Sequence, residues 1–185
     1  MSVPLIAADP VICRLFSRES DQIALPATWL RMWSELSQLE PHMLSVAPEE
    51  LADTLICATV ALMGDEPIGF AGVFPARTRS GEKIWRSGKQ MVEFGSAVVA
   101  KNWRGHHIGR QMLLIRQDYI LSAGYLGVCV TTNPVVQTLL ASSGWQMSSD
   151  HQLCHALCLC SPVPDGYCPT CPLRVNGCWL LPVSV

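Results

Sequence analysis

The chain has 185 residues, of which 49% are hydrophobic and 15% charged, so it has ample apolar material for a packed core and does not read as disordered. Its 13 basic and 15 acidic residues give a formal net charge of -2, which argues against a general affinity for nucleic acid or anionic membranes. The apolar run 55–63 is too short to span a bilayer, and residues 1–9 lack the basic start of a signal peptide. We expect a cytoplasmic protein with no nucleic acid or membrane as a partner.

The first part of the chain predicts helices and then an antiparallel hairpin. Residues 1–25 show no regular pattern, whereas apolar residues recur at helical spacing over 26–39. A second helix start at Pro48 precedes the β-branched and apolar run 54–63. A Gly-Asp-Glu turn then favours a return strand over 67–74.

The second part of the chain predicts strands that alternate with helices. Gly, Pro, Ser and basic residues mark a loop, apolar runs mark strands, and apolar residues three or four positions apart mark helices. The expected elements are, in order, a mobile loop over 75–89, a strand over 90–100, a helix over 108–124, a strand over 125–131, a short helix from Asn133 to Gly144, and a last strand over 152–160.

Basic charge gathers in one part of the chain. Between Arg77 and Arg110 lie eight of the 13 basic residues, against only two acidic residues, Glu82 and Glu93. Gly105 and Gly109, at the turn and the start of the 108–124 helix, would let the backbone approach an anion closely, where unpaired N–H groups and the positive end of the helix dipole converge. The pattern favours a ligand that carries several phosphates, and the alternative is a solvated basic face beside an ordinary tight turn.

Two motifs frame this basic segment. Residues 92–109 read VEFGSAVVAKNWRGHHIG, and Asn133 is followed eleven positions later by Gly144 and then Trp145. The first motif resembles the central strand and acetyl-CoA loop (Arg/Gln-x-x-Gly-x-Gly/Ala) of the GNAT superfamily of acyl-CoA-dependent N-acyltransferases. The second resembles that family's Asn-(x)10-Gly-Phe segment. The resemblance covers about residues 54–160 and implies an α/β fold with a mixed, mostly antiparallel central sheet flanked by helices.

The resemblance implies where acetyl-CoA or a related acyl-CoA, the cosubstrate, would bind. Backbone groups of Val98, Val99 and Ala100 would pair with the pantetheine arm, and Asn133 belongs to the same binding set. N–H groups of the loop would hold the pyrophosphate, and the loop residues are Arg104, Gly105, His106, His107, Ile108, Gly109 and Arg110.

The implied reaction is direct attack of a substrate amine on the thioester in a ternary complex, which needs a base for the ammonium proton and stabilisation of the oxyanion. Glu93, eleven residues before Arg104, matches the position of the family's carboxylate base, and Ser96 or neighbouring N–H groups would face the thioester oxygen. The strand around Glu93 is apolar, so desolvation would raise its pKa. The alternative is a strand-end Glu93 paired with Lys89 or Arg86.

The chain departs from the family pattern at two positions. His107 stands where the loop usually has Gly, and its side chain would either obstruct the phosphates or, if protonated, donate to them. Leu140 stands where a Tyr often serves as general acid for the departing thiolate. Tyr119 and Tyr125 are weak substitutes that fit core positions better, and the paired histidines fit a solvated turn.

Cysteines concentrate at the end of the chain, where six of the nine lie in the last 32 residues. A tetrahedral Zn²⁺ site needs four S or N ligands, and a C-x2-C pair commonly supplies two of them. The predicted zinc ligands are Cys160, Cys168, Cys171 and Cys178, with Cys154, Cys158 or His155 as an alternative fourth ligand. Packed thiols, disulfides, a redox role and an iron–sulfur cluster are the alternatives.

The sequence thus predicts an acyltransferase domain over residues 1–160 and a Cys/Pro-rich extension over 161–185. We expect an N-acyltransferase acting on an amine of a small molecule or protein. The alternatives are a non-catalytic GNAT-like binding protein and a metal or redox sensor based on the tail. The sequence leaves the oligomeric state open, a homodimer included.

Overall fold

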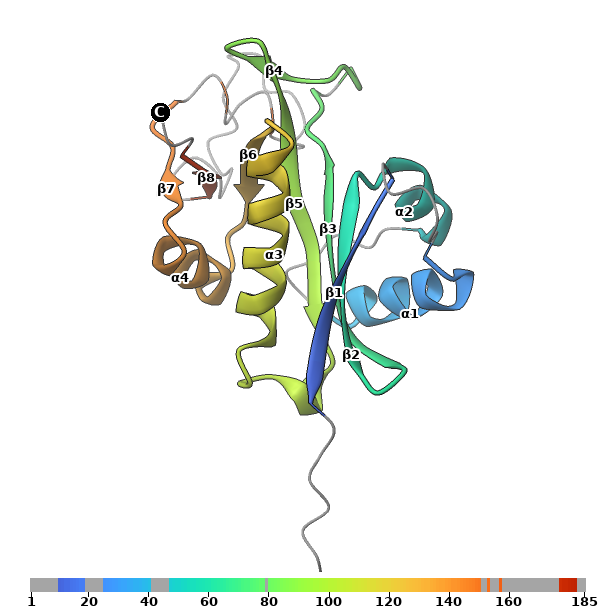
Figure 1. Ribbon diagram of the computed structural model, residues 1–185. Helices are drawn as coiled ribbons and strands as arrows, with labels where there is room; N and C mark the ends of the chain where they lie inside the picture. The colour runs from blue at the N-terminus through green and yellow to red at the C-terminus, as the bar shows by residue number, and fades with distance from the viewer. Residues whose placement is uncertain are drawn as a thin grey trace, which may run out of the picture.

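The computed structural model describes residues 10–18, 25–40, 47–78, 80–150, 153, 157 and 177–182. Its strands are β1 (Val11–Ser17), β2 (Cys57–Met63), β3 (Glu66–Pro75), β4 (Trp85–Arg86), β5 (Lys89–Val99), β6 (Leu126–Val130), β7 (Gln146–Met147) and β8 (Cys178–Leu180). They form one eight-stranded sheet in the order β1-β2-β3-β5-β6-β8-β7, and β4 pairs with β5 off this path (Figure 1). Among the strands of the described residues, only β5 and β6 pair in parallel, and the other pairs are antiparallel. The predicted mixed, mostly antiparallel sheet is confirmed.

Helices cover both faces of the sheet. They are α1 (Ala27–Gln38), α2 (Pro48–Thr54), the 3-10 helix η1 (Lys101–Trp103), α3 (Ile108–Ser122) and α4 (Pro134–Ser142). Figure 1 shows α1 and α2 on one face, with α3 and α4 on the other. The helical spacing over 26–39, the Pro48 start and the two later helices are therefore confirmed. Among the described residues, no helix is long and apolar enough to cross a membrane.

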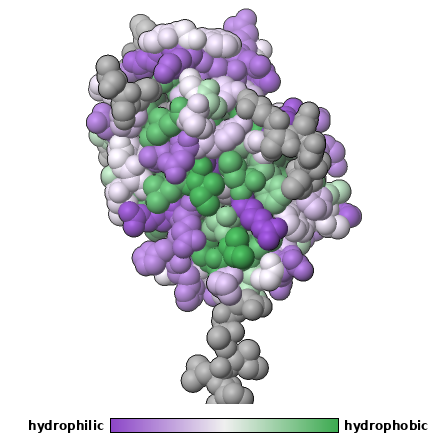
Figure 2. All heavy atoms as spheres, viewed as in Figure 1, coloured by the Kyte–Doolittle hydropathy of each residue, from purple (hydrophilic) through white to green (hydrophobic). Residues whose placement is uncertain are grey.

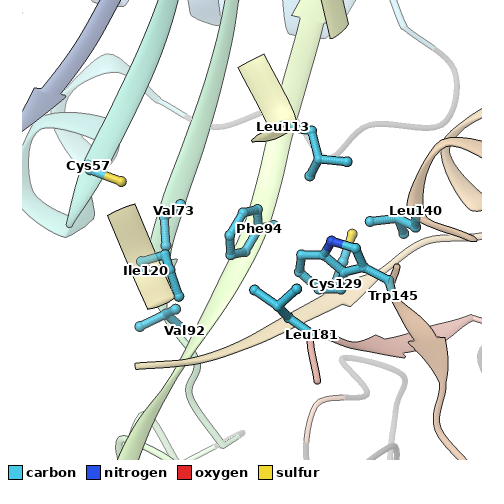
Figure 3. Close-up of a cluster of buried hydrophobic side chains, with 10 residues drawn as sticks. All are labelled: Cys57, Val73, Val92, Phe94, Leu113, Ile120, Cys129, Leu140, Trp145 and Leu181. Atoms are coloured by element: carbon cyan, nitrogen blue, oxygen red, sulfur yellow. The ribbon is translucent and has the colours of Figure 1, made fainter. Parts of the chain in front are cut away.

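The core on the α3 face is built around the aromatic pair Phe94 and Trp145. Their rings meet edge to face with centroids 4.8 Å apart, a geometry that aromatic pairs favour. Leu140 of α4 is buried in the same cluster, as Figure 3 shows. Because this cluster joins α3, α4 and the strands β5 and β6, it fixes the helices that flank the candidate site.

Apolar side chains also reach the surface on the face drawn in Figure 2, where green and purple areas alternate. Exposed large apolar residues of the described chain include Leu15 of β1 and Leu121 of α3. Single exposed apolar residues are normal on soluble proteins.

Three expectations from the sequence are wrong in detail. Residues 11–17, expected to be irregular, form the edge strand β1, because Phe16 packs toward α1 and Val11 packs toward α3. Leu153 and Leu157, expected in a strand, are helical; both are buried, as residues four apart on one helical face would be. The expected loop over 75–89 contains β4, which forms a tight hairpin with β5.

The end of the chain returns to the sheet. Strand β8 lies between β6 and β7 and pairs with both, and Cys178 is buried in it beside Met91 and Val128. Residues 178–180, predicted as part of the extension, thus belong to the sheet. The boundary between domain and extension at residue 160 stays a prediction.

Candidate active site

The two parallel strands at the centre of the sheet separate partway along their length. Met91, Val92 and Glu93 of β5 pair with Leu126, Gly127 and Val128 of β6, and the pairing stops there. Beyond this point β5 continues to Val99 along β3, while β6 continues along β8. The two strands therefore form a fork that opens after Glu93. The facing strand edges leave backbone N–H and C=O groups without a ladder partner, so a chain-like ligand can bind them.

A β-bulge in β5 lies next to the opening of the fork. Val98 pairs with Phe70 and Gly95 pairs with Gly72, so Ser96 and Ala97 together oppose one residue of β3. Ser96 has φ 49, a left-handed conformation that non-glycine residues rarely adopt. The extra residue switches the faces of the strand: Phe94 points to the α3 side, whereas Val98 packs on the α1 side.

The backbone at the end of β5 is divided between the sheet and the fork. The N–H of Ala100 donates to the carbonyl of Ile68 at 2.8 Å, and alternation places the groups of Val98 on the β3 side as well. The groups of Val99 point the other way, and its carbonyl accepts from Nε of Arg104 at 2.9 Å. Of the three residues expected to meet a pantetheine arm, Val99 is the one whose N–H faces the fork.

Glu93 occupies the last paired position before the fork opens. Its neighbours across the strands are Phe74 and Val128, so the half-buried carboxyl group has an apolar setting on the face that carries α1 and α2. Burial raises the pKa of Glu93 above its usual range. Arg86, considered as its partner, is instead ion-paired with Asp150 at 3.3 Å. A carboxyl group in such a setting is suited to accept a proton near neutral pH.

The loop between β5 and α3 presents backbone N–H groups to solvent. Gly105 has φ 84 and His107 has φ 59, and His107 is the N-cap of α3. No side chain caps this helix start, and its first turn has no acidic residue. The N–H of Gln111 makes the first helical bond, to the carbonyl of His107 at 3.1 Å. The N–H groups of residues 108–110 are thus not used within the helix, and the helix dipole adds to their attraction for anions.

The side chains of the loop have different roles. Arg104 bonds the carbonyl of Val99 and also forms an ion pair with Glu40, so its guanidinium shapes the loop. The side chains of His106 and His107 are exposed at the turn, and the centre of the His106 ring lies 6.3 Å from that of the Trp103 ring. The left-handed backbone of His107 is a conformation that glycine adopts more readily than histidine does.

Asn133 caps the start of α4, and Leu140 lies within that helix. The Asn133 side-chain oxygen accepts from the N–H of Val135 at 3.0 Å, so the residue is the N-cap of the helix. Leu140 is 1% exposed, so the place of the usual tyrosine is filled by packed core. Tyr119 and Tyr125 are half-buried against the same core cluster, as the sequence suggested.

The proposed metal ligands are mostly beyond what the structure describes. Cys160, Cys168 and Cys171 lie outside the described residues, as do Cys154, His155 and Cys158. Cys178 is described and buried in β8. Within the described part of the chain, no group of three metal-binding side chains comes together. Zinc binding stays a prediction.

Comparison with solved structures identifies the fold. A GNAT family N-acetyltransferase (YhbS) from Escherichia coli in complex with CoA superposes with a TM-score of 0.56 at 17% identity, over 97% of this chain and 83% of that one. The chain has the GNAT fold. Rv2747 from Mycobacterium tuberculosis, in complex with CoA and NLQ, gives a TM-score of 0.60 at 12% identity, over 94% of this chain and 99% of that one.

A third structure with the GNAT fold has a named acceptor class. It is the aminoglycoside N-acetyltransferase AAC(6')-Iy in complex with CoA, with a TM-score of 0.54 at 18% identity, over 79% of this chain and 94% of that one. No family model and no curated protein matches the sequence. Identity this low carries the fold and not the acceptor, so the function must be argued from the site.

Two parts of the site could not be read from the sequence. Gly95 within the strand is the one sign of a bulge in residues 94–99, but the extra residue and its place are decided by the pairing register with β3. Trp33 follows the helical spacing of α1 and looks like a core residue, yet its indole N–H donates to the carbonyl of Ser96 at 2.7 Å. The signal that could have pointed to Trp33 is its polar N–H, which needs a partner when it is buried.

Proposed function

We propose that the chain is an N-acyltransferase that moves an acetyl or related acyl group from acyl-CoA to an amine. One observation carries the proposal: the β5–β6 fork has a desolvated carboxyl group at its closed end and the uncapped N-terminus of α3 beyond its open end. A thioester with a long arm and a pyrophosphate fits this layout, because its reactive and anionic ends need those two environments. The CoA bound by proteins with the same fold supports the same choice.

Each part of the site has a role in binding acyl-CoA. The N–H groups of residues 108–110, with the turn at Gly105, would hold the pyrophosphate. The N–H of Val99 would pair with the pantetheine arm along the open edge of β5. Asn133, the N-cap of α4, would also bind the pantetheine arm. Its side-chain oxygen is used by the cap, and its amide nitrogen can donate a hydrogen bond to the arm.

The chemistry follows from the position of Glu93. Its carboxylate takes a proton from the substrate ammonium group, and the resulting amine attacks the thioester carbonyl carbon and forms the C–N bond. The C–S electron pair then leaves with the sulfur, and the nitrogen gives its second proton to water. N–H groups at the bulge beside Ser96 would stabilise the oxyanion. Because Leu140 offers no proton, CoA leaves as a thiolate and gains a proton from water. An ordinary thiol pKa of about 8.5 makes this feasible.

The second candidate is a non-catalytic acyl-CoA-binding protein. The observation in its favour is the burial of Leu140, which leaves no proton donor at that point of α4. Both candidates predict binding, and only the first predicts release of CoA thiol in the presence of an amine.

The test begins with calorimetry of acetyl-CoA binding and an amine screen read by thiol release. Glu93→Gln should lower turnover by a factor of about 100 while the affinity for acetyl-CoA changes less than about threefold, because the amide fills the same space and cannot accept the proton. Glu82→Gln, an equal change at an exposed loop residue, is the matched control. No binding at millimolar acetyl-CoA would overturn both candidates; binding with no transfer to any amine would favour the second.

A further inference from the structure

The indole of Trp33 makes a buried contact with the bulge of β5. Trp33 is 0% exposed, and its ring stacks on Phe70 with centroids 5.6 Å apart and planes 11° from parallel. This stacking aims the indole N–H at the carbonyl of Ser96, at 2.7 Å. The contact therefore joins α1 to the one residue of β5 that has a left-handed backbone.

The conformation of Ser96 needs such support. A non-glycine residue in the left-handed region is strained, and the strain persists only where surrounding contacts fix it. The regular sheet does not fix it, because Ser96 and Ala97 share one opposing residue of β3. The bond from Trp33 holds the carbonyl of Ser96 toward α1 and thereby limits rotation of the peptide unit that includes the N–H of Ala97.

The position of the bulge links this contact to the proposed reaction. Ser96 is three residues after Glu93 on β5, and Val99 is three residues after Ser96. A change in the bulge would alter the strand faces on either side of it, because the extra residue sets which side chains point to α1 and which to α3. The base and the edge that would bind the pantetheine arm are therefore in register only while the bulge keeps its shape.

We propose that Trp33 is a positioning residue for acyl transfer, which acts by holding the Ser96 bulge in the shape that sets the thioester against Glu93. The inference rests on the proposed function. It assigns to α1 a role beyond packing, and it makes the indole N–H, rather than the bulk of the ring, the group that matters.

The first test is Trp33→Phe, which keeps an aromatic ring over Phe70 and removes the N–H donor. Trp29→Phe is the matched control, since Trp29 lies on the same helix and packs its ring on Phe16. Thiol release from acetyl-CoA with the best amine of the screen gives kcat and KM. We expect W33F to lower kcat about tenfold with the KM for acetyl-CoA changed less than threefold, and W29F to stay within twofold on both.

The second test asks whether Trp33 acts through Ser96. Ser96→Gly and Ser96→Ala both remove the hydroxyl, but only glycine adopts a positive φ without strain. In the W33F background, S96G should exceed S96A in kcat by about threefold or more, whereas the two differ less than twofold when Trp33 is present. Equal kcat values in the W33F background would overturn the proposal.

A third measurement needs no substitution. The indole N–H of Trp33 should exchange with D2O at least about 100-fold more slowly than that of Trp85, which is 61% exposed. Comparable exchange rates, or W33F with the kcat of W29F, would overturn the role of Trp33. A wild-type protein that does not bind acetyl-CoA, yet shows slow exchange at Trp33, would overturn the proposed function and this inference with it while leaving the contact itself established.

Discussion

Arg116 is a buried cation in α3, and replacing it tests how this helix is joined to the strands β3 and β5. The side chain is 3% exposed. Its guanidinium donates from Nη1 to the carbonyl of Gly72 at 2.7 Å and from Nε to the carbonyl of Met112 at 3.1 Å, and it lies 5.2 Å from the centre of the Phe94 ring. No carboxylate pairs with it among the described residues. It connects α3, which follows the proposed phosphate-binding loop, to β3 through Gly72 and to β5 through Phe94.

The free energy of this arrangement can be estimated in two parts. Burial lowers the pKa of Arg116 to about 10, from an ordinary value above 12. At about 1.4 kcal/mol per pKa unit, the charge costs the folded state about 3 kcal/mol at neutral pH. Against this stand the bond to the buried Gly72 carbonyl, about 1–3 kcal/mol if left unmade, and the cation–π contact, about 0.5–2 kcal/mol. The two sides nearly cancel.

Arg116→Met removes the charge and both donors but keeps most of the volume, so the free energy of unfolding in urea should stay within about 2 kcal/mol of wild type. Arg116→Ala also leaves a cavity and should lose about 3–5 kcal/mol. A loss of more than about 4 kcal/mol in R116M would refute the reasoning, because it would show that the buried charge is strongly stabilising. A lower kcat for R116M, measured under conditions in which the variant stays folded, would show that Arg116 also holds the bulge.

Two further predictions concern Glu93, the proposed base, and the proposed phosphate-binding loop before α3. Because the folded-state pKa of Glu93 is raised, the stability that its neutral form contributes is present at pH 4 and is lost as the pH rises through the folded-state pKa. Thermal unfolding at pH 4 and pH 8 should therefore show a smaller loss of stability between the two pH values for Glu93→Gln than for wild type. Equal losses of stability would contradict a desolvated carboxyl group. Gly105→Ala and Gly124→Ala place a side chain at φ 84 and φ 75 with nothing within 4 Å of the new Cβ, so each should cost about 1 kcal/mol of stability. Only G105A, in the loop before α3, should weaken acetyl-CoA binding, by about tenfold in calorimetry. Equal affinities of the two variants for acetyl-CoA would argue against this loop as the phosphate site.

The sequence located the main elements because they depend on local patterns. Helical spacing identified α1 and α3, and the turn at Gly64 identified the β2–β3 hairpin, since each needs only residues close together in the chain. Glu93 and the loop up to Gly109 were proposed because residues 92–109 resemble the GNAT central strand and acetyl-CoA loop, where a strand, a glycine turn and a helix start form one continuous stretch. These parts of the candidate site are encoded locally.

Tertiary structure decided what depends on pairing between distant segments. The sequence 152–160 predicts a strand, but Leu153 and Leu157 are helical, and both are buried. Residues four positions apart share a face in a strand and in a helix alike, so their spacing does not distinguish the two. Strand β8 lies between β6 and β7 in the sheet although it is far from both in the sequence, and no local pattern can specify such a pairing.

The composition of the chain determined that it packs a core, and the basic stretch from Arg77 to Arg110 predicts where an anion would bind. The fork after Glu93, the bulge at Ser96 and the hydrogen bond from Trp33 depend instead on the register of β5 against β3 and β6. Register is a property of two strands at once, so one strand's sequence cannot fix it. The residues of this site were therefore legible in the chain, and the geometry that lets them act together exists only in the folded sheet.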